Sequence, residues 1–543
     1  MKFSEINRIS CDVLIIGGGG AGLRAAIEAR ESGADVLLVS KARVGYANNT
    51  YIAKAIIAVS GWGDQRDGGK AHLEDTVKGG RFLNDPELVS AMVEAAKTEI
   101  SFLEKCGVAF AKKEGRFQIE QIAGHRFPRQ IRGQHRTGSD LILPLKQYAE
   151  KIGVRFVDRV FITRLFSSGN RVAAASGVSH DGRFLVFSAG SVILTTGGFG
   201  QVYLHTNNAA GITGDGQALA LHLGLPLKDM EFVQFYPTAA GRLGTRLILS
   251  EVLVMAEGAI LRNRAGEDIV IKHGLNDPMR LTRDRLAQAI MRELLAGRGV
   301  DGGIIMDLSP IAEERLAPLA TLLPSAWHPD QKTLVVAPTT HFCMGGIVID
   351  KNAETPLAGL FAAGETTAGI HGANRLGGNA LCEVFTFGRI AGQMAAVRAK
   401  EMGPVNPPGE MIDHEKVRLE SHFGGSGLDP KVLCRSLKEA MWSKAGILRD
   451  PEGLGEALEK ISHIGSEAAK ASIGKMSDLI RCLELENMLL LSEVVCRAAL
   501  LRTESRGSHY RTDCPEEDND RWLRNIVVKK EEARLTYRES SLP

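Results

Sequence analysis

The chain has 543 residues, which is too long for one hydrophobic core, and at roughly 150 residues per domain it should form about three or four structural units. Hydrophobic residues make up 44% of the chain, charged residues make up 24%, and the formal net charge is only +2. This composition is typical of a globular enzyme, and it argues against the strongly charged surfaces that bind nucleic acid or acidic membranes.

The first predicted elements form a strand–turn–helix–strand unit. A buried strand over Cys11–Ile16 leads into a glycine-rich turn over 17–22, and a helix is predicted over Leu23–Ser32. A second strand is predicted over Ala34–Ser40. The turn contains the pattern G-x-G-x-x-G, which in this context predicts a dinucleotide site rather than an ordinary glycine-rich turn.

Each glycine of the pattern has a physical role. Gly17 allows a tight turn, Gly19 lets the backbone approach a pyrophosphate, and Gly22 lets the helix pack closely, while the helix N-terminus faces the phosphates. The acidic residue that NAD-dependent dehydrogenases carry after the second strand is absent, because Ser40 and Lys41 stand there. That absence weakens the interpretation as a simple NAD dehydrogenase.

Three further glycine clusters lie at predicted strand ends or helix starts. The first, 197–200, follows an apolar strand over 191–195, and the second, 211–216, opens a helix. The third, 359–364, is followed by Glu365. These clusters favour one long ligand lying across several strand ends, with FAD as the ligand that fits; the alternative is a set of unrelated turns.

The last part of the chain reads as helical. Three prolines at 404, 407 and 408 mark a linker, and the run 474–502 repeats apolar residues at helical spacing. Its leucines are most simply explained as the core of a helical bundle. No stretch approaches the ~18 apolar residues that cross a membrane, and the first apolar run, 13–16, is too short for a signal peptide.

Motifs spread along the chain carry a family resemblance. The longest is His-Gly-Ala-Asn-Arg-Leu-Gly-Gly-Asn at 371–379. The others, in chain order, are Ser40-Lys41, Gln-Phe-Tyr-Pro-Thr at 234–238, Ser250-Glu251, Thr-Arg-Asp at 282–284, Pro-Thr-Thr-His-Phe-Cys-Met-Gly-Gly at 338–346 and Glu-Ser-Arg-Gly-Ser-His-Tyr-Arg at 504–511. In this order they resemble the succinate dehydrogenase/fumarate reductase flavoprotein family, which includes L-aspartate oxidase. The resemblance covers nearly the whole chain.

The family fold implies an α/β protein, in which a Rossmann-like FAD-binding domain carries an inserted α+β capping domain and a C-terminal helical domain. The discontinuous FAD-binding domain would comprise residues 1–225 and 340–400, and the capping domain would comprise residues 226–339. The helical domain would span residues 404–515, and residues 516–543 would form a short tail. The active site would lie between the flavin and the capping domain.

The resemblance also implies roles for individual residues. Arg283 matches the arginine that exchanges a proton with the substrate, and Glu251 matches a link in its proton relay. The substrate-binding positions would be His341, Arg375, Ser250 and Tyr236. Without the motifs, Arg283 would be interpreted as a surface residue at a helix start. His341 and Arg375 would be interpreted as residues with a structural role.

The implied cofactor is FAD, which exchanges a hydride with the substrate through its flavin ring. Its contacts would be Gly17, Gly19, Gly20, Ala21, Gly22, Ser40, Lys41, Asp215, Glu365, Arg375, Asn379 and Leu381. The alternative for Asp215 is a turn residue between two glycines. The segment 44–60 corresponds to the one that often carries a histidine joined covalently to FAD, and it contains no histidine here. We therefore expect non-covalent FAD and a lower flavin potential, which favours reduction of an alkene.

A second departure concerns the substrate. The histidine of the family motif Q-[YF]-H-P-T is replaced by Tyr236, so a neutral phenol stands where a carboxylate-binding histidine is usual. The leading hypothesis is a fumarate-reductase-like catalytic subunit that interconverts fumarate and succinate. The alternatives are L-aspartate oxidase, a flavoenzyme acting on another enoate or alkanoate, and an electron-transfer or assembly subunit with a vestigial substrate site.

The cysteine pattern bears on the electron donor. The eight cysteines include no C-x-x-C pair, so we expect reduced thiols, a cytoplasmic location and no iron–sulfur cluster on this chain. Electrons would then come from a separate iron–sulfur partner, as the resemblance implies, and any membrane association would be through such a partner. The sequence predicts no nucleic-acid partner.

Overall fold

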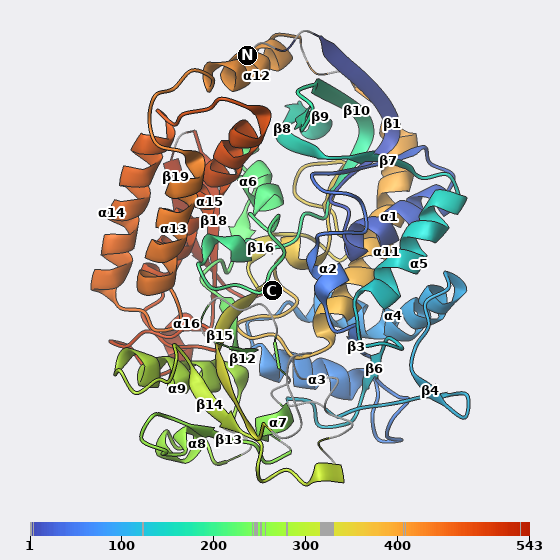
Figure 1. Ribbon diagram of the computed structural model, residues 1–543. Helices are drawn as coiled ribbons and strands as arrows, with labels where there is room; N and C mark the ends of the chain where they lie inside the picture. The colour runs from blue at the N-terminus through green and yellow to red at the C-terminus, as the bar shows by residue number, and fades with distance from the viewer. Residues whose placement is uncertain are drawn as a thin grey trace.

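The computed structural model describes residues 3, 5–121, 124–241, 243, 248, 249, 252–255, 257–277, 281–314, 316, 331–405, 407, 409–532 and 534–542. Figure 1 shows three regions: a sheet with crossing helices on the right, a helical bundle on the left and a smaller sheet at the bottom. The α/β fold expected from the sequence is confirmed. Among the described residues, no helix is long and apolar enough to cross a bilayer.

The largest sheet has the strand order β7-β2-β1-β10-β9-β8, with β17 also paired to β10. Its strands are β1 (Ile6–Ile16), β2 (Val36–Ser40), β7 (Arg155–Asp158), β8 (Val160–Ser168), β9 (Arg171–Ser179), β10 (Phe184–Leu194) and β17 (Leu360–Ala362). The strands β7, β2, β1, β10 and β17 run parallel, so their carboxyl ends meet at one edge. Ligands bind at this edge in open parallel sheets, which places the site there.

Two helices that are distant in the sequence cross on this sheet. Helix α1 (Gly20–Glu31) packs against α11 (Asn379–Met402), and both contact the central strands. The crossing is close because α11 presents glycines: a Cβ atom at Gly392 would lie 2.4 Å from the Ala25 carbonyl oxygen. This packing brings the loop 371–379, which precedes α11, to the edge where α1 begins.

The first predicted elements are present with shifted ends. Strand β1 begins five residues earlier than expected, since 6–10 continue the parallel ladder with β10. Helix α1 begins at Gly20 rather than Leu23, because the last glycines of the turn already adopt helical conformation. Elements between the central strands are α2 (Asn49–Ile52), β3 (Ile56–Ala58), α3 (Gly69–Gly79), α4 (Pro86–Lys105), β4 (Lys112–Lys113), β5 (Arg116–Phe117), β6 (Gln130–Arg132) and α5 (Ser139–Lys151).

A second sheet lies in the region expected to be the capping domain. Its order is β12 (Val233–Ala240), β15 (Thr333–Cys343), β14 (Ile304–Asp307) and β13 (Ile260–Arg262). The helices described with it are α7 (Val252–Met255), α8 (Ile269–Lys272) and α9 (Arg283–Leu295). This region has its own hydrophobic core, in which Leu286 and Ile290 of α9 pack beneath the sheet. The long strands β12 and β15 connect it to the FAD-binding region.

Four helices make the bundle: α12 (Gly409–Ser421), α13 (Pro430–Lys444), α14 (Pro451–Ala468) and α15 (Met476–Leu501). The side chains of Asp429 and Asp450 cap the starts of α13 and α14, each before a proline at the first helical position. Helix α15 matches the predicted run 474–502 within two residues, and its leucines from 479 to 491 are buried apart from Leu490, which is partly buried, whereas Leu501 at its end is exposed. Figure 1 shows α13 and α14 side by side.

The segment expected to be a tail folds as a hairpin. Strands β18 (Asn525–Glu531) and β19 (Arg534–Ser540) follow the short helix α16 (Asn519–Trp522). They complete a sheet of order β16-β11-β18-β19 with β11 (Leu227–Lys228) and β16 (Gly346–Ile347). The turn of the hairpin contains Glu532 at φ 53° rather than an Asn-Gly or Asp-Gly pair, so the usual sequence signal for a hairpin is missing.

A buried charge network ties this hairpin to the bundle. The Arg502 Nε atom lies 2.7 Å from Glu231 Oε1, and its Nη1 atom lies 3.0 Å from Glu504 Oε1. The same guanidinium donates to the backbone carbonyls of Trp522 and Arg524. All three charged side chains are fully buried, and Glu504 also pairs with Arg506, whose Nε atom lies 2.7 Å from Glu504 Oε1. Glu231 is neutralised by its pair with Arg502.

We expect Arg502→Met to lower the free energy of unfolding by about 3–5 kcal/mol, because it leaves Glu231 buried without its cation, while Glu504 keeps its pair with Arg506. Urea unfolding followed by circular dichroism measures the change. The control is Arg435→Met, which removes an exposed i,i+4 pair with Glu439 and should change the free energy by no more than about 0.5 kcal/mol. Equal effects of the two substitutions would contradict the assignment.

Candidate functional site

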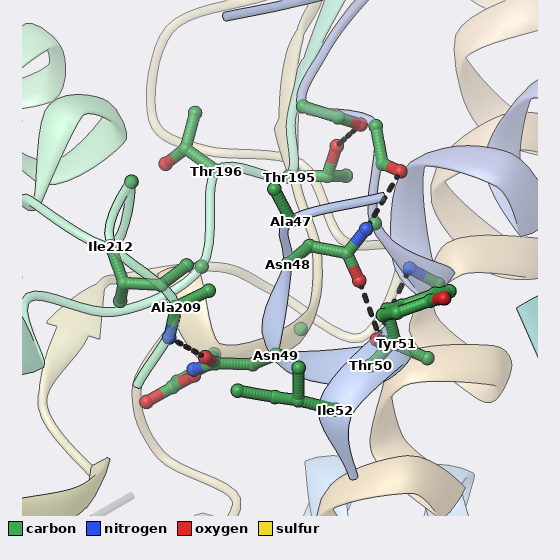
Figure 2. A pocket seen from close by; sticks show the side chains of 18 of the residues that line it. Ala47, Asn48, Asn49, Thr50, Tyr51, Ile52, Thr195, Thr196, Ala209 and Ile212 are labelled. Atoms are coloured by element: carbon green, nitrogen blue, oxygen red, sulfur yellow. Dashed lines mark hydrogen bonds between the residues drawn. The ribbon is translucent and has the colours of Figure 1, made fainter. Parts of the chain in front are cut away.

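A large cavity of about 1340 Å³ lies at the carboxyl edge of the main sheet. It is lined by the glycine-rich turn, the end of β2, α2, β8, the start of α6 (Asp215–His222), β12, β15, the loop 371–379 and one face of α15. Figure 2 shows the part of it lined by residues 47–52 together with Thr195, Thr196, Ala209 and Ile212, of which Ala209 is bonded to Asn49. All three regions of the fold therefore contribute to one site.

The glycine-rich turn has no space for a side chain at its first and last glycines. Gly17 has φ +122°, and a Cβ atom there would lie 2.3 Å from the Thr195 carbonyl oxygen. A Cβ atom at Gly22 would lie 1.9 Å from the Gly17 carbonyl oxygen. The Thr195 hydroxyl donates to the Ile16 and Gly17 carbonyls at 3.1 and 3.0 Å, which holds the turn against β10.

Gly19, at the start of α1, has no side chain to cap the helix, and the Gly20 N–H donates to the Thr50 hydroxyl at 3.2 Å. The first N–H groups of a helix have no partner within the helix, and the helix dipole favours an anion there. The turn and the helix start line the cavity together. They fit the pyrophosphate of a dinucleotide, because the absence of side chains at these glycines leaves the backbone accessible.

Lys41 forms an ion cluster in the cavity wall. Its Nζ atom lies 2.7 Å from Asp215 Oδ2 and 2.9 Å from Glu484 Oε1, and it donates to the Thr213 hydroxyl at 2.6 Å. Burial alone would lower the pKa of Lys41, but the two carboxylates outweigh it and raise that pKa above its ordinary value. Glu484 comes from α15, 443 residues away in the sequence, so sequence reasoning had no signal for it.

Glu365 is held between the backbone and an asparagine. Its Oε1 atom accepts from the Cys343 N–H at 3.1 Å, and its Oε2 atom accepts from Asn49 Nδ2 at 3.0 Å. The side-chain oxygen Oδ1 of Asn49 accepts from the Ala209 N–H at 3.0 Å, as Figure 2 shows. Burial raises the pKa of Glu365 to about 7, so near neutral pH this group can exchange a proton or accept hydrogen bonds from ligand hydroxyls.

Cationic and aromatic side chains gather in another part of the cavity. The Arg283 guanidinium lies 5.0 Å from the centroid of the Tyr236 ring, and that ring lies edge-on to His341 with 5.2 Å between centroids. Arg375 donates to Gln234 Oε1 at 2.9 Å, and its guanidinium lies 4.6 Å from the centroid of the Phe342 ring.

Electrostatics keep His341 neutral. Burial, and then the charges of Arg375, Arg283 and Lys54, hold the pKa of His341 well below its ordinary value of 6.5. Its Nδ1 atom lies 3.1 Å from Asn207 Nδ2. A neutral imidazole beside fixed cations can form hydrogen bonds with a carboxylate, while the guanidinium groups supply the positive charge. The arrangement suits a small anionic substrate.

Most of the predicted site residues line the cavity. They are Gly17, Gly19, Gly20, Ala21, Ser40, Lys41, Asp215, Tyr236, Arg283, His341, Glu365, Arg375 and Leu381. Gly22 lies behind the turn, where it packs against Gly17. The Asn379 side chain is directed to α3, where it donates to Thr76 Oγ1 at 2.9 Å and its oxygen lies 2.8 Å from His72 Nε2. Ser250 and Glu251 lie outside the described residues.

Several lining residues are not predicted by any motif. Lys54 and Asn49 belong to the segment 44–60, where the sequence draws attention only to the lack of a histidine. Glu484 lies in the run 474–502, which the sequence predicts as a bundle helix with no part in the site. The glycine cradle, the long cavity and the hydroxyl-accepting carboxylates Asp215 and Glu365 together fit FAD. The lining residues from segment 44–60 include no histidine that could be joined to it.

Comparison with known proteins relates the chain to FAD-binding domains and to fumarate reductase flavoproteins. The family model described as "FAD binding domain" matches residues 12–381, and the one described as "Fumarate reductase flavoprotein C-term" matches residues 434–542. A subunit of the fumarate reductase (CoM/CoB) of Methanothermobacter marburgensis is 38% identical, covering 97% of this chain and 98% of that protein. The fumarate reductase flavoprotein subunit of Mycobacterium tuberculosis is 36% identical, and the match covers 96% of this chain and 95% of that protein.

A solved structure of a fumarate reductase protein is also similar to this chain. The FrdA protein of E. coli quinol fumarate reductase, in a form that carries one mutation, superposes with a TM-score of 0.91 at 29% identity. The match covers 99% of this chain and 97% of that chain. The likeness therefore extends over all three regions of the fold.

The raised pKa of Glu365 predicts a pH dependence. In the unfolded chain this carboxyl titrates near 4.5, whereas in the folded chain it titrates near 7. Between these values the folded chain binds more protons than the unfolded chain, so this group makes stability fall as pH rises. Glu365→Gln removes the effect. We expect the free energy of unfolding of the variant, relative to the parent, to increase by about 2–3 kcal/mol from pH 5 to pH 7.

Urea unfolding of both proteins, freed of FAD, at the two pH values measures this difference. A difference between variant and parent that is the same at pH 5 and pH 7 would contradict the assignment. The same variant should bind FAD more weakly, because an amide replaces a carboxyl that is placed to accept from ligand hydroxyls.

Proposed function

The chain belongs to the succinate dehydrogenase/fumarate reductase flavoprotein family, and on that premise we propose that it is an FAD-dependent catalytic subunit that reduces fumarate to succinate. The observation that carries the proposal is the convergence of Arg283, Arg375 and His341 in the same cavity as the glycine-rich turn. A substrate with two carboxylates requires several fixed cationic and hydrogen-bonding groups, and these residues supply them next to the cofactor site.

Each residue of the site has a separate role in the proposed reaction. Arg375 and the neutral His341 bind carboxylate oxygens, and Tyr236 donates one hydrogen bond through its hydroxyl. Arg283 provides the proton, and its position at the start of α9, against the face of Tyr236, fixes its guanidinium. Ser250 and Glu251 would serve as a further donor and as the relay that returns a proton to Arg283. FAD, when bound, supplies the hydride that the reduction requires.

The cofactor is held without a covalent bond in this proposal. The backbone at Gly17, Gly19, Gly20 and Ala21 would contact the pyrophosphate. Asp215 and Glu365 would accept from ribose and ribityl hydroxyls, and Ser40, Lys41, Leu381 and Asn379 would complete the site. Asn379 would act through its backbone at the start of α11, since its side chain contacts α3. FAD held without a covalent bond is expected to have a lower reduction potential than covalently bound FAD, and a lower potential favours fumarate reduction over succinate oxidation.

The electrons would come from a separate iron–sulfur protein. All eight cysteines are free thiols. In the described part of the chain, the only group of three metal-type ligands consists of His422, Cys482 and Glu486, which includes a single thiol. An iron–sulfur cluster generally requires four cysteine ligands, so this chain shows no place for one among its described residues. The relative from Methanothermobacter marburgensis is itself named as a subunit.

One observation favours a second candidate, a flavoenzyme that acts on another enoate or alkanoate. Tyr236 is buried, and its ring packs against Arg283 and His341, so it narrows the substrate end without adding positive charge. A substrate with a less polar end would suit that surface. L-Aspartate oxidase gains no comparable support, and a vestigial site is disfavoured because the cationic residues still converge.

The test of the function is anaerobic oxidation of reduced methyl viologen by the FAD-loaded protein. We expect oxidation to depend on fumarate, because the artificial donor replaces the missing iron–sulfur partner. Crotonate, which has one carboxylate, serves as the comparison. Turnover of crotonate without turnover of fumarate would favour the second candidate.

Arg283→Ala should lower the fumarate-dependent rate by about 10²–10⁴-fold, because the group that delivers the proton is removed. The FAD content, measured from the flavin absorbance, should stay at one per chain. The matched control is Arg285→Ala, two residues along the same helix, where the side chain is exposed. Loss of FAD together with activity would show that Arg283 supports the cofactor rather than the reaction.

A further inference from the structure

Lys54 lies on a backbone segment that is fixed on both sides. It follows α2 and precedes β3. The Gly138 N–H donates to the Ala53 carbonyl at 2.7 Å, and the Gly133 N–H donates to the Ala55 carbonyl at 2.9 Å. Ala55 has φ +51°, a left-handed conformation that is uncommon for a residue with a side chain. Such strain persists only where the surrounding structure holds it, and it is frequent at binding sites.

The Lys54 ammonium is buried at the substrate end of the cavity. Lys54 lines the cavity, and its Nζ atom is shielded from solvent. Its charge acts on His341 in the same direction as the charges of Arg375 and Arg283, and all four residues line the same cavity. These positive charges attract an anion bound in the cavity.

The side chains at the substrate end of the cavity explain what a lysine contributes to carboxylate binding there. Tyr236 presents its ring to Arg283 and to His341, and it carries no charge. His341 is held neutral. The guanidinium of Arg375 is already engaged by Gln234 and lies over Phe342. Of the described cations whose charge acts on His341, Arg283 is assigned to proton delivery and Arg375 to one carboxylate, so Lys54 is available to the second carboxylate.

We propose that Lys54 is a specificity-determining residue that binds one carboxylate of the dicarboxylate substrate. This proposal rests on the proposed function and extends it to the choice between dicarboxylates and monocarboxylates. An ammonium group presents three donors on a flexible stem, so it can follow a carboxylate that a rigid guanidinium cannot reach. The residue holds charge and moves no proton in the reaction.

The experiment compares holoenzymes with Lys54→Met, Lys54→Arg and Lys70→Met. Lys70 lies exposed on α3, so its substitution removes one positive charge outside the cavity. Binding of malonate, a dicarboxylate that cannot be reduced, is measured by titration of the oxidised flavin absorbance. The values of KM and kcat are measured with fumarate and with monomethyl fumarate, which has one carboxylate.

We expect Lys54→Met to weaken malonate binding and to raise KM for fumarate by about 10- to 100-fold, the usual effect of losing a charge-assisted hydrogen bond. KM for monomethyl fumarate should change by less than about 3-fold, so the preference for the diacid shrinks. The FAD content and the kcat for fumarate should stay near those of the parent. Lys54→Arg should recover at least part of the malonate affinity, and Lys70→Met should match the parent.

Two results would overturn the inference. Unchanged malonate binding in Lys54→Met would show that the ammonium does not contact the ligand. Equal losses for fumarate and its monomethyl ester, or a loss of FAD, would show a structural or cofactor-binding role. A parent protein that neither binds malonate nor reduces fumarate would overturn the proposed function itself, which is a distinct outcome because it precedes any comparison of variants.

Discussion

The site depends on a close contact between the glycine-rich turn and the end of β10. Gly17 and Gly22 leave no volume for a Cβ atom, and the Thr195 hydroxyl bonds to the carbonyls on either side of the first of these glycines. This contact fixes the start of α1 at the carboxyl edge of the sheet. Helix α11 then packs on α1 through its own glycines and delivers the loop 371–379, with Arg375, to the same edge. Backbone proximity, rather than side-chain chemistry, therefore positions the two halves of the cavity.

Charge is distributed unevenly around that cavity. At the Lys41 cluster, two carboxylates flank one lysine, so the group carries a net negative charge. At the Arg283 end, cations and a neutral histidine line the cavity. The first arrangement suits the hydroxyl groups of a cofactor and the second suits an anion. One cavity can therefore hold a large cofactor and a small charged substrate in separate environments.

The sequence predicts the parts of this structure that depend on local pattern. The strand–turn–helix unit and helix α15 follow from periodicity and glycine spacing, with errors of a few residues at their ends. The hairpin of β18 and β19 was missed because its turn lacks the usual residues and its pairing partner, β11, lies almost 300 residues earlier. Glu484 and Lys54 were missed for a related reason: neither belongs to a motif, and only the packing of distant elements shows that they face the cavity. The side chain of Asn379 illustrates the reverse case, in which motif membership does not determine direction.

The pairing of Lys41 with Glu484 has a consequence for how the protein is made. The wall of the cofactor site joins a residue near the start of the chain to one 443 positions later. A nascent chain therefore emerges from the ribosome with its glycine-rich turn long before α15 exists to close the cavity. Domains that close through such distant contacts fold slowly, because the loop between them must be ordered first. The wall of the cofactor site is therefore complete only after residue 484 has been synthesised and the Glu484 carboxylate has reached Lys41.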